Sequence, residues 1–452
     1  MLVLRLFVAS IAVLALCLIS ACDGTEEGAE PAATSQDGEA GEDEDEDDGE
    51  GSDSGSEAPD EPAVTGQILD PIDLSAELLH ERIDMAKDYL AAAVDADGRF
   101  TYRINLSGET PRPAYNVLRH AGTIYALGQV HERGGEPEVA KPISRATDYL
   151  IQRYVRTPED GSGWLAVFSR PDEESLDTDG PEAKLGGAGL ALLAMDAARD
   201  SGALDVNVET MKALGRFMLF MQHGDGSFHS KYSESEGYLA FQSLYYPGEA
   251  ILGFIRLYEA EPDPRWLRAA ALGTAHLVET RRGETDLPAD HWLMLAMEPL
   301  LGLYGQLDQP PVSATEIREH MLQLGLSMIS EQEEAERDGG PSGSFARDGR
   351  CTPTATRLEG LAALWRSMGA WGLDSDRARV ADSVGRGTQF LLTCQVLEGE
   401  GIGGVLRAQK PLDSADSSFN RRQAEIRIDY VQHAISAMYG ALDVLFEETP
   451  RD

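Results

Sequence analysis

Six apolar segments of the chain, spread over residues 115 to 447, each begin with side chains that can bind or transfer a proton. Their first two turns are polar, whereas their second halves hold far fewer such groups. General acid–base catalysis needs titratable groups within reach of one substrate atom. We therefore expect the segment starts to form one site. The side chains are Tyr115, Asn116, Arg119 and His120; Lys184; Tyr245, Tyr246 and Glu249; Asp290, His291 and Trp292; Thr356, Arg357 and Glu359; and Arg427, Asp429, Tyr430, Gln432 and His433.

These residues divide into two expected roles. Carboxylates and imidazoles, with one guanidinium, form the expected catalytic group: His120, Arg119, Glu249, Asp290, Asp429 and His433. Aromatic, amide and further charged side chains form the expected substrate-binding group: Tyr115, Asn116, Lys184, Tyr246, Trp292, Arg357, Glu359, Tyr430 and Gln432. Trp292 and the tyrosines offer flat faces on which sugar rings can stack.

Three reactions on a sugar remain open. Paired carboxylates that flank a glycosidic bond would indicate a hydrolase. A tyrosine or histidine base, with a cation that neutralises a uronate, would indicate a lyase or an epimerase. An acidic sugar fits the available side chains better than a neutral one, given the mix of Tyr115, Tyr246, Tyr430, Arg119, Lys184, Arg357 and His120. A domain that only binds an envelope ligand or partner is the non-catalytic alternative.

Several of these residues also have a structural interpretation. Asp290 and Asp429 stand where helix N-caps belong, and capping alone explains many such residues. His433 and Gln432 could pair with neighbouring helices, and Glu249 could be a first-turn acid that the helix dipole favours. Arg119 and His120 lie within an apolar segment, so we expect a functional role for them.

Helical periodicity dominates residues 70–448, and the segments alternate between two classes. The amphipathic class comprises 76–94, 140–155, 209–222, 264–279, 315–332 and 377–395. The apolar, small-sided class comprises 115–132, 184–200, 246–261, 290–306, 355–371 and 429–447. Helices that are apolar nearly all round are enclosed, and amphipathic helices face water. Six such pairs predict an inner ring of helices inside an outer ring, with Gly186, Gly187, Ala188 and Gly189 allowing close approach.

This pattern resembles the α/α toroid, and we expect an all-α fold, an (α/α)6 toroid of six helical hairpins. The toroid is shared by prenyltransferase and terpene-cyclase repeats, lanthionine-synthetase-like cyclases, and six-hairpin glycosidase-like hydrolases, lyases and epimerases. "TQFLLTCQ…GIGGVL" and "GRFMLFMQHGDGSF" are similar to the helix–Gln–Gly–aromatic repeat of the cyclase branch. No single family's catalytic motif is matched. The resemblance implies that the inner helices start on one face, where their dipoles would favour an anionic group.

Zinc is the alternative to an acid–base site. Lanthionine-type cyclases and protein prenyltransferases hold zinc at the mouth of the toroid, and Asp290 or His291 with His433 could imitate part of that set. The cysteines do not stand at inner-helix starts, however. Cys351 and Cys394 are better explained as a disulfide on the rim of the pocket, which an oxidising compartment permits. We therefore expect no cofactor.

The N-terminus resembles a bacterial lipoprotein signal. A short basic start and an apolar run lead into Ile19-Ser20-Ala21-Cys22, which is similar to the lipobox. The resemblance implies a signal peptide at 1–21, lipidation of Cys22, and anchoring to a membrane on its periplasmic or extracellular face. Cys17 would leave with the signal.

Residues 22–66 form the most acidic part of a chain whose formal net charge is −40. Between Asp23 and Glu61 there are 18 acidic residues and no lysine or arginine. Such a segment cannot bury enough apolar surface to fold, and it repels phosphate backbones. We expect a disordered tether at 22–66, a toroid domain at 67–452 and no nucleic-acid partner. The expected function is binding, and processing by acid–base chemistry, of a glycan or cell-envelope polymer.

Overall fold

The computed structural model describes residues 72–447, with gaps at 110, 112–113, 135–136, 160, 175–177, 179, 370 and 413–416. These residues belong to one compact unit, which spans Asp53–Asp452. The signal peptide, Cys22 and the acidic tether lie outside the described residues, so their assignments stay predictions. No helix in the described ranges combines the length and the apolar character needed to cross a membrane.

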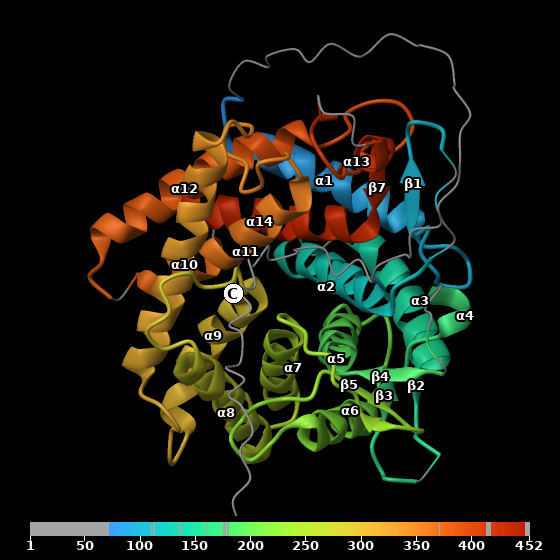
Figure 1. Cartoon of the computed structure of the whole chain (residues 1–452). Coiled ribbons are helices and arrows are strands. Elements are labelled where there is room, and N and C mark those ends of the chain that lie inside the picture. Colours follow the sequence, from blue (N-terminus) through green and yellow to red (C-terminus); the bar gives the residue numbers. More distant parts are fainter. Residues whose placement is uncertain are drawn as a thin grey trace, which may run out of the picture. The chain divides into compact units, whose positions relative to one another are not determined.

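Two concentric rings of six helices build the domain (Figure 1). The outer ring contains α1 (Ala76–Ala93), α3 (Pro137–Tyr154), α6 (Val208–Met221), α8 (Pro264–Thr280), α10 (Ala314–Arg337) and α12 (Asp374–Thr393). The inner ring contains α2 (Val117–Gly134), α5 (Leu185–Asp200), α7 (Tyr246–Ala260), α9 (His291–Leu303), α11 (Cys351–Met368) and α14 (Ile428–Phe446). Each inner helix packs against the next, and α14 packs against α2 to close the ring. The predicted all-α (α/α)6 toroid is confirmed.

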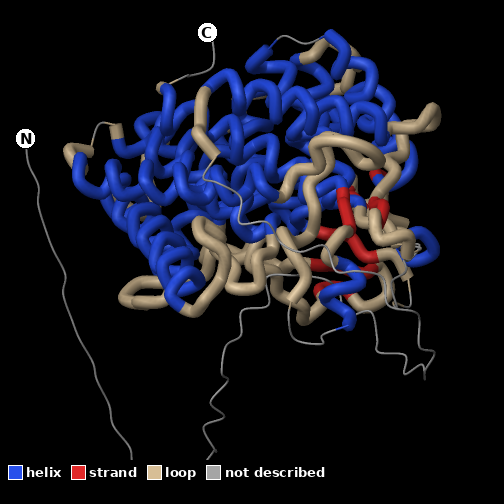
Figure 2. The backbone as a smooth tube through the Cα atoms, turned by 90° about the horizontal axis from the view of Figure 1, so that it is seen from above, coloured by secondary structure: helices blue, strands red, loops and turns tan. Residues whose placement is uncertain are grey.

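The minor elements gather with the long loops on one side of the helical body (Figure 2). They are the short helices α4 (Pro171–Glu174) and α13 (Ser417–Arg422), and the strands β1 (Arg103–Asn105), β2 (Val155–Arg156), β3 (Ala166–Val167), β4 (Glu182–Lys184), β5 (Lys231–Ser233), β6 (Gly237–Tyr238) and β7 (Glu425–Arg427). The 3-10 helix η1 (Tyr304–Gln306) instead follows the end of α9. The strands pair antiparallel as β1–β7, β2–β3 and β4–β5–β6. Because β4 runs directly into α5 and β7 into α14, the strand pairs fix where these inner helices begin.

Glutamines at or near the ends of three outer helices join each of these helices to the next one in the ring. The side-chain amide of Gln222 donates to the Ala269 carbonyl of α8 at 2.9 Å. Gln332 donates likewise to Ser383 of α12 at 3.2 Å, and Gln395 to Arg82 of α1 at 2.9 Å. The last bond links the sixth outer helix, α12, to the first, α1. The helix–Gln–Gly motif of the sequence therefore closes the outer ring.

The glycine-rich start of α5 lets two inner helices touch backbone to backbone. A Cβ atom on Gly189 would stand 2.4 Å from the carbonyl oxygen of Glu249, and one on Gly253 would stand 2.8 Å from the Cα atom of Gly189. Neither distance is compatible with a side chain larger than hydrogen. The predicted close approach at Gly189 is confirmed, and it sets the tight packing of α5 on α7.

A disulfide joins Cys351 and Cys394, whose Cα atoms lie 6.3 Å apart. Cys351 is the first residue of α11, four residues earlier than the expected helix start, and Cys394 caps the end of α12. Both side chains are fully buried. The predicted pairing is confirmed, and it links an inner-helix start to an outer-helix end.

Candidate functional site

Three titratable side chains from three inner helices meet where the helices begin. The Glu359 carboxylate of α11 lies 2.9 Å from Nδ1 of His433 on α14 and 3.8 Å from Nε2 of His291 on α9. The two imidazole centroids are 5.5 Å apart. His291 is almost completely buried, and neither of its ring nitrogens has a hydrogen-bond partner among the described residues. We call this group the His–Glu–His cluster.

The surroundings of the two histidines move their pKa values in opposite directions. Burial lowers the pKa of His291 well below its ordinary value, and the neighbouring His433 lowers it further. Burial also disfavours a charge on His433, but the Glu359 carboxylate and then Asp429 outweigh it and raise the pKa of His433. These shifts favour the neutral form of His291, which can accept a proton, and the protonated form of His433, which can donate one.

Aromatic rings surround the cluster. Trp292, beside His291 on α9, lies 5.3 Å from the His291 ring and 6.3 Å from the His433 ring, measured between centroids. Tyr245, which precedes α7, meets the His291 ring edge-on at 5.1 Å. Tyr125 of α2 lies 6.3 Å from Trp292. This enclosure suits the flat faces of a sugar ring and excludes water from the imidazoles.

An ion-pair network at the start of α14 stands next to the cluster. Arg427 binds both carboxylate oxygens of Asp429, at 2.7 and 3.0 Å, and Nε of Arg119 lies 3.1 Å from Asp429. Although burial opposes it, Arg427 and then Arg119 lower the pKa of Asp429 to about 2. Asp429 therefore stays ionised, positions Arg119 and favours the charge on His433. It does not serve as a proton donor.

A small cavity of about 50 Å³ continues from Glu359 along the axis of the ring, past Gln129 and Ser436. Beyond it Asp443, fully buried, accepts from Arg133 at 2.7 and 2.8 Å and from Arg366 at 2.9 Å. Arg366 also contacts both carboxylate oxygens of Glu298, at 2.7 and 2.6 Å. The expectation that the second helix halves carry little polar chemistry is wrong. Charged residues inside apolar segments were the signal for this network.

The structure places His120 away from the cluster. Its Nε2 atom lies 2.8 Å from the Ala146 carbonyl of outer helix α3, and its Nδ1 atom lies 2.7 Å from the Tyr115 hydroxyl. That hydroxyl also accepts from the Phe100 amide at 3.2 Å. His120 and Tyr115 therefore fill their hydrogen-bonding capacity between the two rings. The geometry favours a structural role over the expected catalytic and binding roles, because an apolar helix face can point outward as well as inward.

Asp290 acts as a helix N-cap, as its structural interpretation predicted. One oxygen accepts from the Leu293 amide at 3.1 Å, as an N-cap does, and the other lies 2.9 Å from Arg281. An N-cap role explains Asp290 but does not explain the histidine next to it. That unexplained histidine, His291, was the sequence signal for a catalytic candidate that the expected catalytic group did not include. Asn116 likewise caps α2, because its side-chain oxygen accepts from the Leu118 amide at 2.8 Å.

The cations that favoured an acidic sugar are neutralised within the protein. Lys184 pairs with Glu174 at 3.3 Å, and both side chains are buried. Arg357 pairs with Glu331 of outer helix α10 at 3.1 Å, and Arg119 pairs with Asp429. The preference for an acidic sugar therefore loses its basis.

The remaining expected residues lie between inner helices. Glu249 and the Tyr246 ring pack against Gly186 of α5, where a Cβ atom would overlap both. Gln432 packs against Gly122 of α2 and accepts from the Thr123 hydroxyl at 3.5 Å. Tyr430 donates to Glu425 at 3.1 Å. Of the expected site, Trp292, Glu359, Asp429, Arg119 and His433 are thus brought together.

The side chains of the His–Glu–His cluster are also of the types that bind a metal ion. One ligand atom from each of His291, Glu359 and His433 lies within 4.8 Å of the others. Ligand atoms around a tetrahedral zinc ion stand ~3.4 Å apart, given bond lengths of about 2.0–2.2 Å. The 2.9 Å contact between His433 and Glu359 is instead a hydrogen-bond distance. The geometry therefore favours a shared proton.

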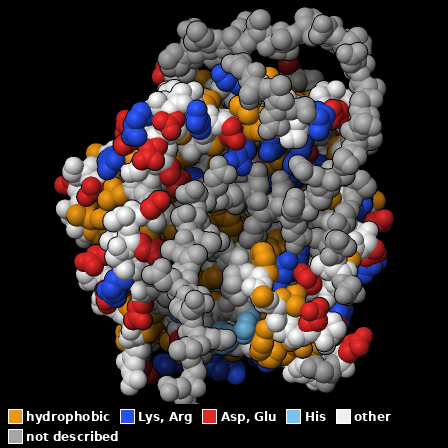
Figure 3. Space-filling model, in the orientation of Figure 1, with side chains coloured by type: hydrophobic (Ala, Val, Ile, Leu, Met, Phe, Trp, Pro, Cys, Tyr) orange, Lys and Arg blue, Asp and Glu red, His pale blue; other side chains and the backbone are white. Residues whose placement is uncertain are grey.

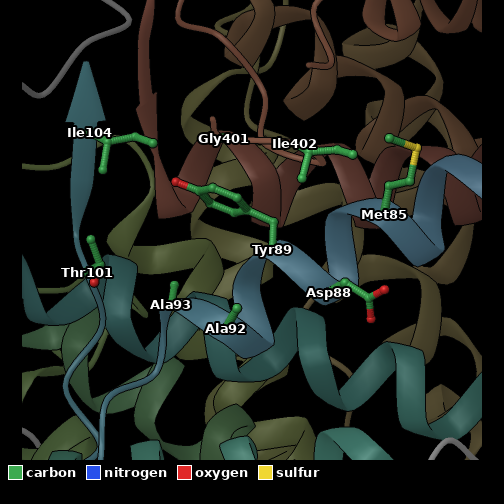
Figure 4. A pocket seen from close by; sticks show the side chains of 9 residues that line it. All are labelled: Met85, Asp88, Tyr89, Ala92, Ala93, Thr101, Ile104, Gly401 and Ile402. Atoms are coloured by element: carbon green, nitrogen blue, oxygen red, sulfur yellow. The ribbon is translucent and has the colours of Figure 1, made fainter. Parts of the chain in front are cut away.

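A second hollow lies on the outer ring, between α1 and the loop around Gly401. It has a volume of about 420 Å³. Figure 4 shows the Tyr89 ring between Ile104 and Ile402, and Asp88 is the single ionisable carboxylate in its lining. This groove lacks the paired titratable groups that a catalytic site needs.

Comparison with known proteins shows similarity in fold only. No family model and no curated protein matches the sequence. Cellobiose 2-epimerase from Spirochaeta thermophila superposes over 82% of this chain and 98% of its own, with a TM-score of 0.56 and 15% identity. The α-1,6-mannanase GH76A of Salegentibacter, in complex with α-1,6-mannotriose, superposes over 81% of this chain and 99% of its own, with a TM-score of 0.54 and 11% identity. An unsaturated glucuronyl hydrolase specific for heparin superposes over 83% of this chain and 99% of its own, with a TM-score of 0.54 and 12% identity. The chain has the six-hairpin toroid fold of these carbohydrate-active enzymes.

Proposed function

We propose that the protein processes an uncharged glycan by proton transfer at a sugar carbon, in the manner of an epimerase. The carrying observation is the pair of adjacent histidines whose pKa values are shifted apart around one shared carboxylate. Such a pair supplies a base and an acid at the same pH. Sugar epimerases are among the proteins of the same fold.

In this reaction neutral His291 removes the proton from the carbon next to the carbonyl of an opened reducing sugar. The electron pair moves to the carbonyl oxygen and forms an enediolate. Protonated His433 then delivers a proton to the other face of the same carbon, and the carbonyl re-forms. Proton exchange with solvent after product release returns His291 to its neutral form and His433 to its protonated form. The sugar keeps its composition and inverts one centre. Glu359 holds the His433 ring in position and stabilises its charge.

Hydrolysis and elimination are the alternatives within the same substrate class, and both are separable from epimerisation by product. Incubation of the protein with cellobiose and α-1,6-mannobiose in D₂O, followed by NMR, should show deuterium at the carbon next to the carbonyl. New reducing ends would identify a hydrolase, and an unsaturated sugar would identify a lyase. Absence of all three products across reducing oligosaccharides would support the non-catalytic, ligand-binding toroid. Elemental analysis of protein purified without chelator tests the zinc alternative, because one equivalent of metal would contradict the shared proton.

We also propose that the domain is tethered to a membrane through a lipid on Cys22, as the similarity of residues 19–22 to the lipobox supports. A Cys22→Ala variant should move from the membrane fraction to the soluble fraction. Unchanged partitioning would contradict the lipid anchor without affecting the proposed reaction.

A further inference from the structure

A row of aromatic rings crosses the surface beside the β5–β6 hairpin. Phe220 stacks on Trp164 at a centroid distance of 5.4 Å, and Tyr238 follows Phe220 at 5.2 Å. His229 stacks flat on Tyr238 at 3.8 Å, and His223 continues the row at 4.2 Å. In Figure 3 a histidine and hydrophobic side chains adjoin in the lower half of the face shown. We call these five residues the aromatic row.

Two apolar members of the row, Phe220 and Tyr238, are exposed, whereas Trp164 is buried. Five large hydrophobic side chains of the described residues are exposed, and three of them, Phe220 at 37%, Tyr238 at 44% and Phe241 at 36%, belong to this region. Neighbouring exposed rings on a soluble domain are typical of a binding surface. Carbohydrate is a natural occupant, because its C–H faces pack on rings while its hydroxyls remain solvated.

The rings are held in place before any ligand arrives. The Tyr238 hydroxyl donates to the Phe220 carbonyl at 3.2 Å. Tyr232 meets Trp164 and Phe220 edge-on, at 5.9 and 5.4 Å, and Trp164 itself is buried against Phe217 at 5.0 Å. A ring that is already ordered loses little conformational entropy on binding.

A polar hollow of about 360 Å³ lies on the same hairpin. Its lining includes Ser233, Ser235, Glu182 and Glu236, and the two serine hydroxyls are 2.9 Å apart. Hydroxyls and carboxylates are suitable partners for sugar hydroxyls. Glu182 is paired with Lys231 at 3.2 Å, so Glu236 is the lining carboxylate that disfavours a uronate.

The hairpin is connected to the proposed active site along the chain. The chain runs from β6 through residues 239–245 to the start of α7, and the Tyr245 ring lies 5.1 Å from the His291 ring. A ligand that spans this segment would place its terminal sugar at the histidines and its remaining sugars along the hairpin. Because the proposed reaction at the histidines acts on a sugar, this connection favours an oligosaccharide over a protein partner as the occupant.

We propose that the aromatic row and the polar hollow of the β5–β6 hairpin form an extended binding site for an uncharged oligosaccharide that continues outward from the toroid mouth. The inference extends the proposed function, and it rests on that function for the direction in which the oligosaccharide runs. The site makes the protein selective for longer oligosaccharides over disaccharides. Phe220 and Tyr238 are specificity-determining residues in this scheme and do not touch the reacting carbon.

Binding of cellobiose, cellohexaose, α-1,6-mannobiose and α-1,6-mannohexaose, measured by calorimetry, tests the site. At least one hexasaccharide should bind more tightly than its disaccharide, and Tyr238→Ala and Phe220→Ala should each weaken that hexasaccharide by about three- to tenfold. The disaccharide should be unaffected. Leu397→Ala and Ile402→Ala, which truncate side chains that are 48% and 51% exposed elsewhere, are the matched controls.

Three outcomes would overturn the proposal: no binding of any of the four sugars, equal binding of both lengths, or no effect of the two ring variants. A dimer that Tyr238→Ala dissociates would identify a second copy of the chain as the occupant and would also overturn it. Because the assay measures binding, it separates this site from the reaction. Length-dependent binding without turnover would retain the site and refute the proposed chemistry.

Discussion

The carboxylate of Glu359 holds the imidazole of His433 at 2.9 Å, across the boundary between α11 and α14. These helices are the fifth and sixth members of the inner ring, 74 residues apart in sequence. The contact therefore forms when the last two inner helices pack against each other. Packing of these two helices and the charge on His433 are coupled.

Replacing Glu359 with Gln should move the pH dependence of turnover. The carboxylate raises the pKa of His433, and turnover needs the protonated ring, so activity falls as the pH rises through that pKa. Without the negative charge the high-pH limb of kcat should shift by ~1 pH unit toward acid. Profiles of kcat against pH for the wild type and the variant measure the shift.

The low-pH limb provides the internal control. It reports His291, whose pKa is lowered chiefly by burial and only secondarily by His433. It should move less than the high-pH limb, and in the opposite sense if His433 becomes neutral. A Glu359→Gln profile that superposes on the wild type would show that His433 is not the essential acid.

Replacing the two histidines of the cluster should separate catalysis from stability. His433→Asn and His291→Asn each remove a proton-transfer group, and turnover should fall by about 10²–10⁴-fold. His120→Leu should instead leave the Tyr115 hydroxyl and the Ala146 carbonyl without their partner and cost about 2–4 kcal/mol of unfolding free energy. Urea denaturation and initial rates at saturating substrate measure the two effects. The assignment would be reversed if His120→Leu lost turnover while remaining folded.

The twelve long helices were predictable from sequence because the two rings differ in composition. Inner segments are apolar all round and outer segments are amphipathic, so periodicity places each one. The face on which a polar residue stands was harder to predict. His120 and His433 both sit early in apolar helices, but His120 points toward α3 and His433 toward α11. Inner-helix composition cannot distinguish these directions, since both sides of the helix are buried.

Charge neutralisation was equally inaccessible to sequence. Arg357 lies near the start of α11, and its partner Glu331 lies on α10, so the two meet only through ring geometry. Arg119 and Asp429 come from the second and last long helices of the domain. A list of cations at helix starts therefore predicted an acidic sugar that the paired charges do not favour.

Reduction of the Cys351–Cys394 disulfide should destabilise the domain. The bond closes a loop with a sequence separation of 43 residues, and the chain-entropy relation gives about 4 kcal/mol for a loop of that length. Calorimetry with and without a reducing agent should show a lower Tm after reduction. The double variant with Cys351→Ser and Cys394→Ser should start at the lower Tm and show no response to the reductant. An equal fall in Tm in both proteins would show that the reducing agent does not act through this disulfide.

Replacement of Asp443 with Asn should show how much the charged network at the far end of the ring contributes to the free energy of unfolding. Asp443 is fully buried between Arg133 and Arg366, and its loss leaves two guanidiniums with less compensation. Breaking a buried ion pair is costly, but both arginines are partly exposed, so we expect a loss of about 2–4 kcal/mol in unfolding free energy. Asp382→Asn is the matched control, because its pair with Arg386 lies on the surface and should contribute less than about 0.5 kcal/mol. The free energies from urea denaturation decide the comparison, and equal values for the two variants would refute a structural role for the network.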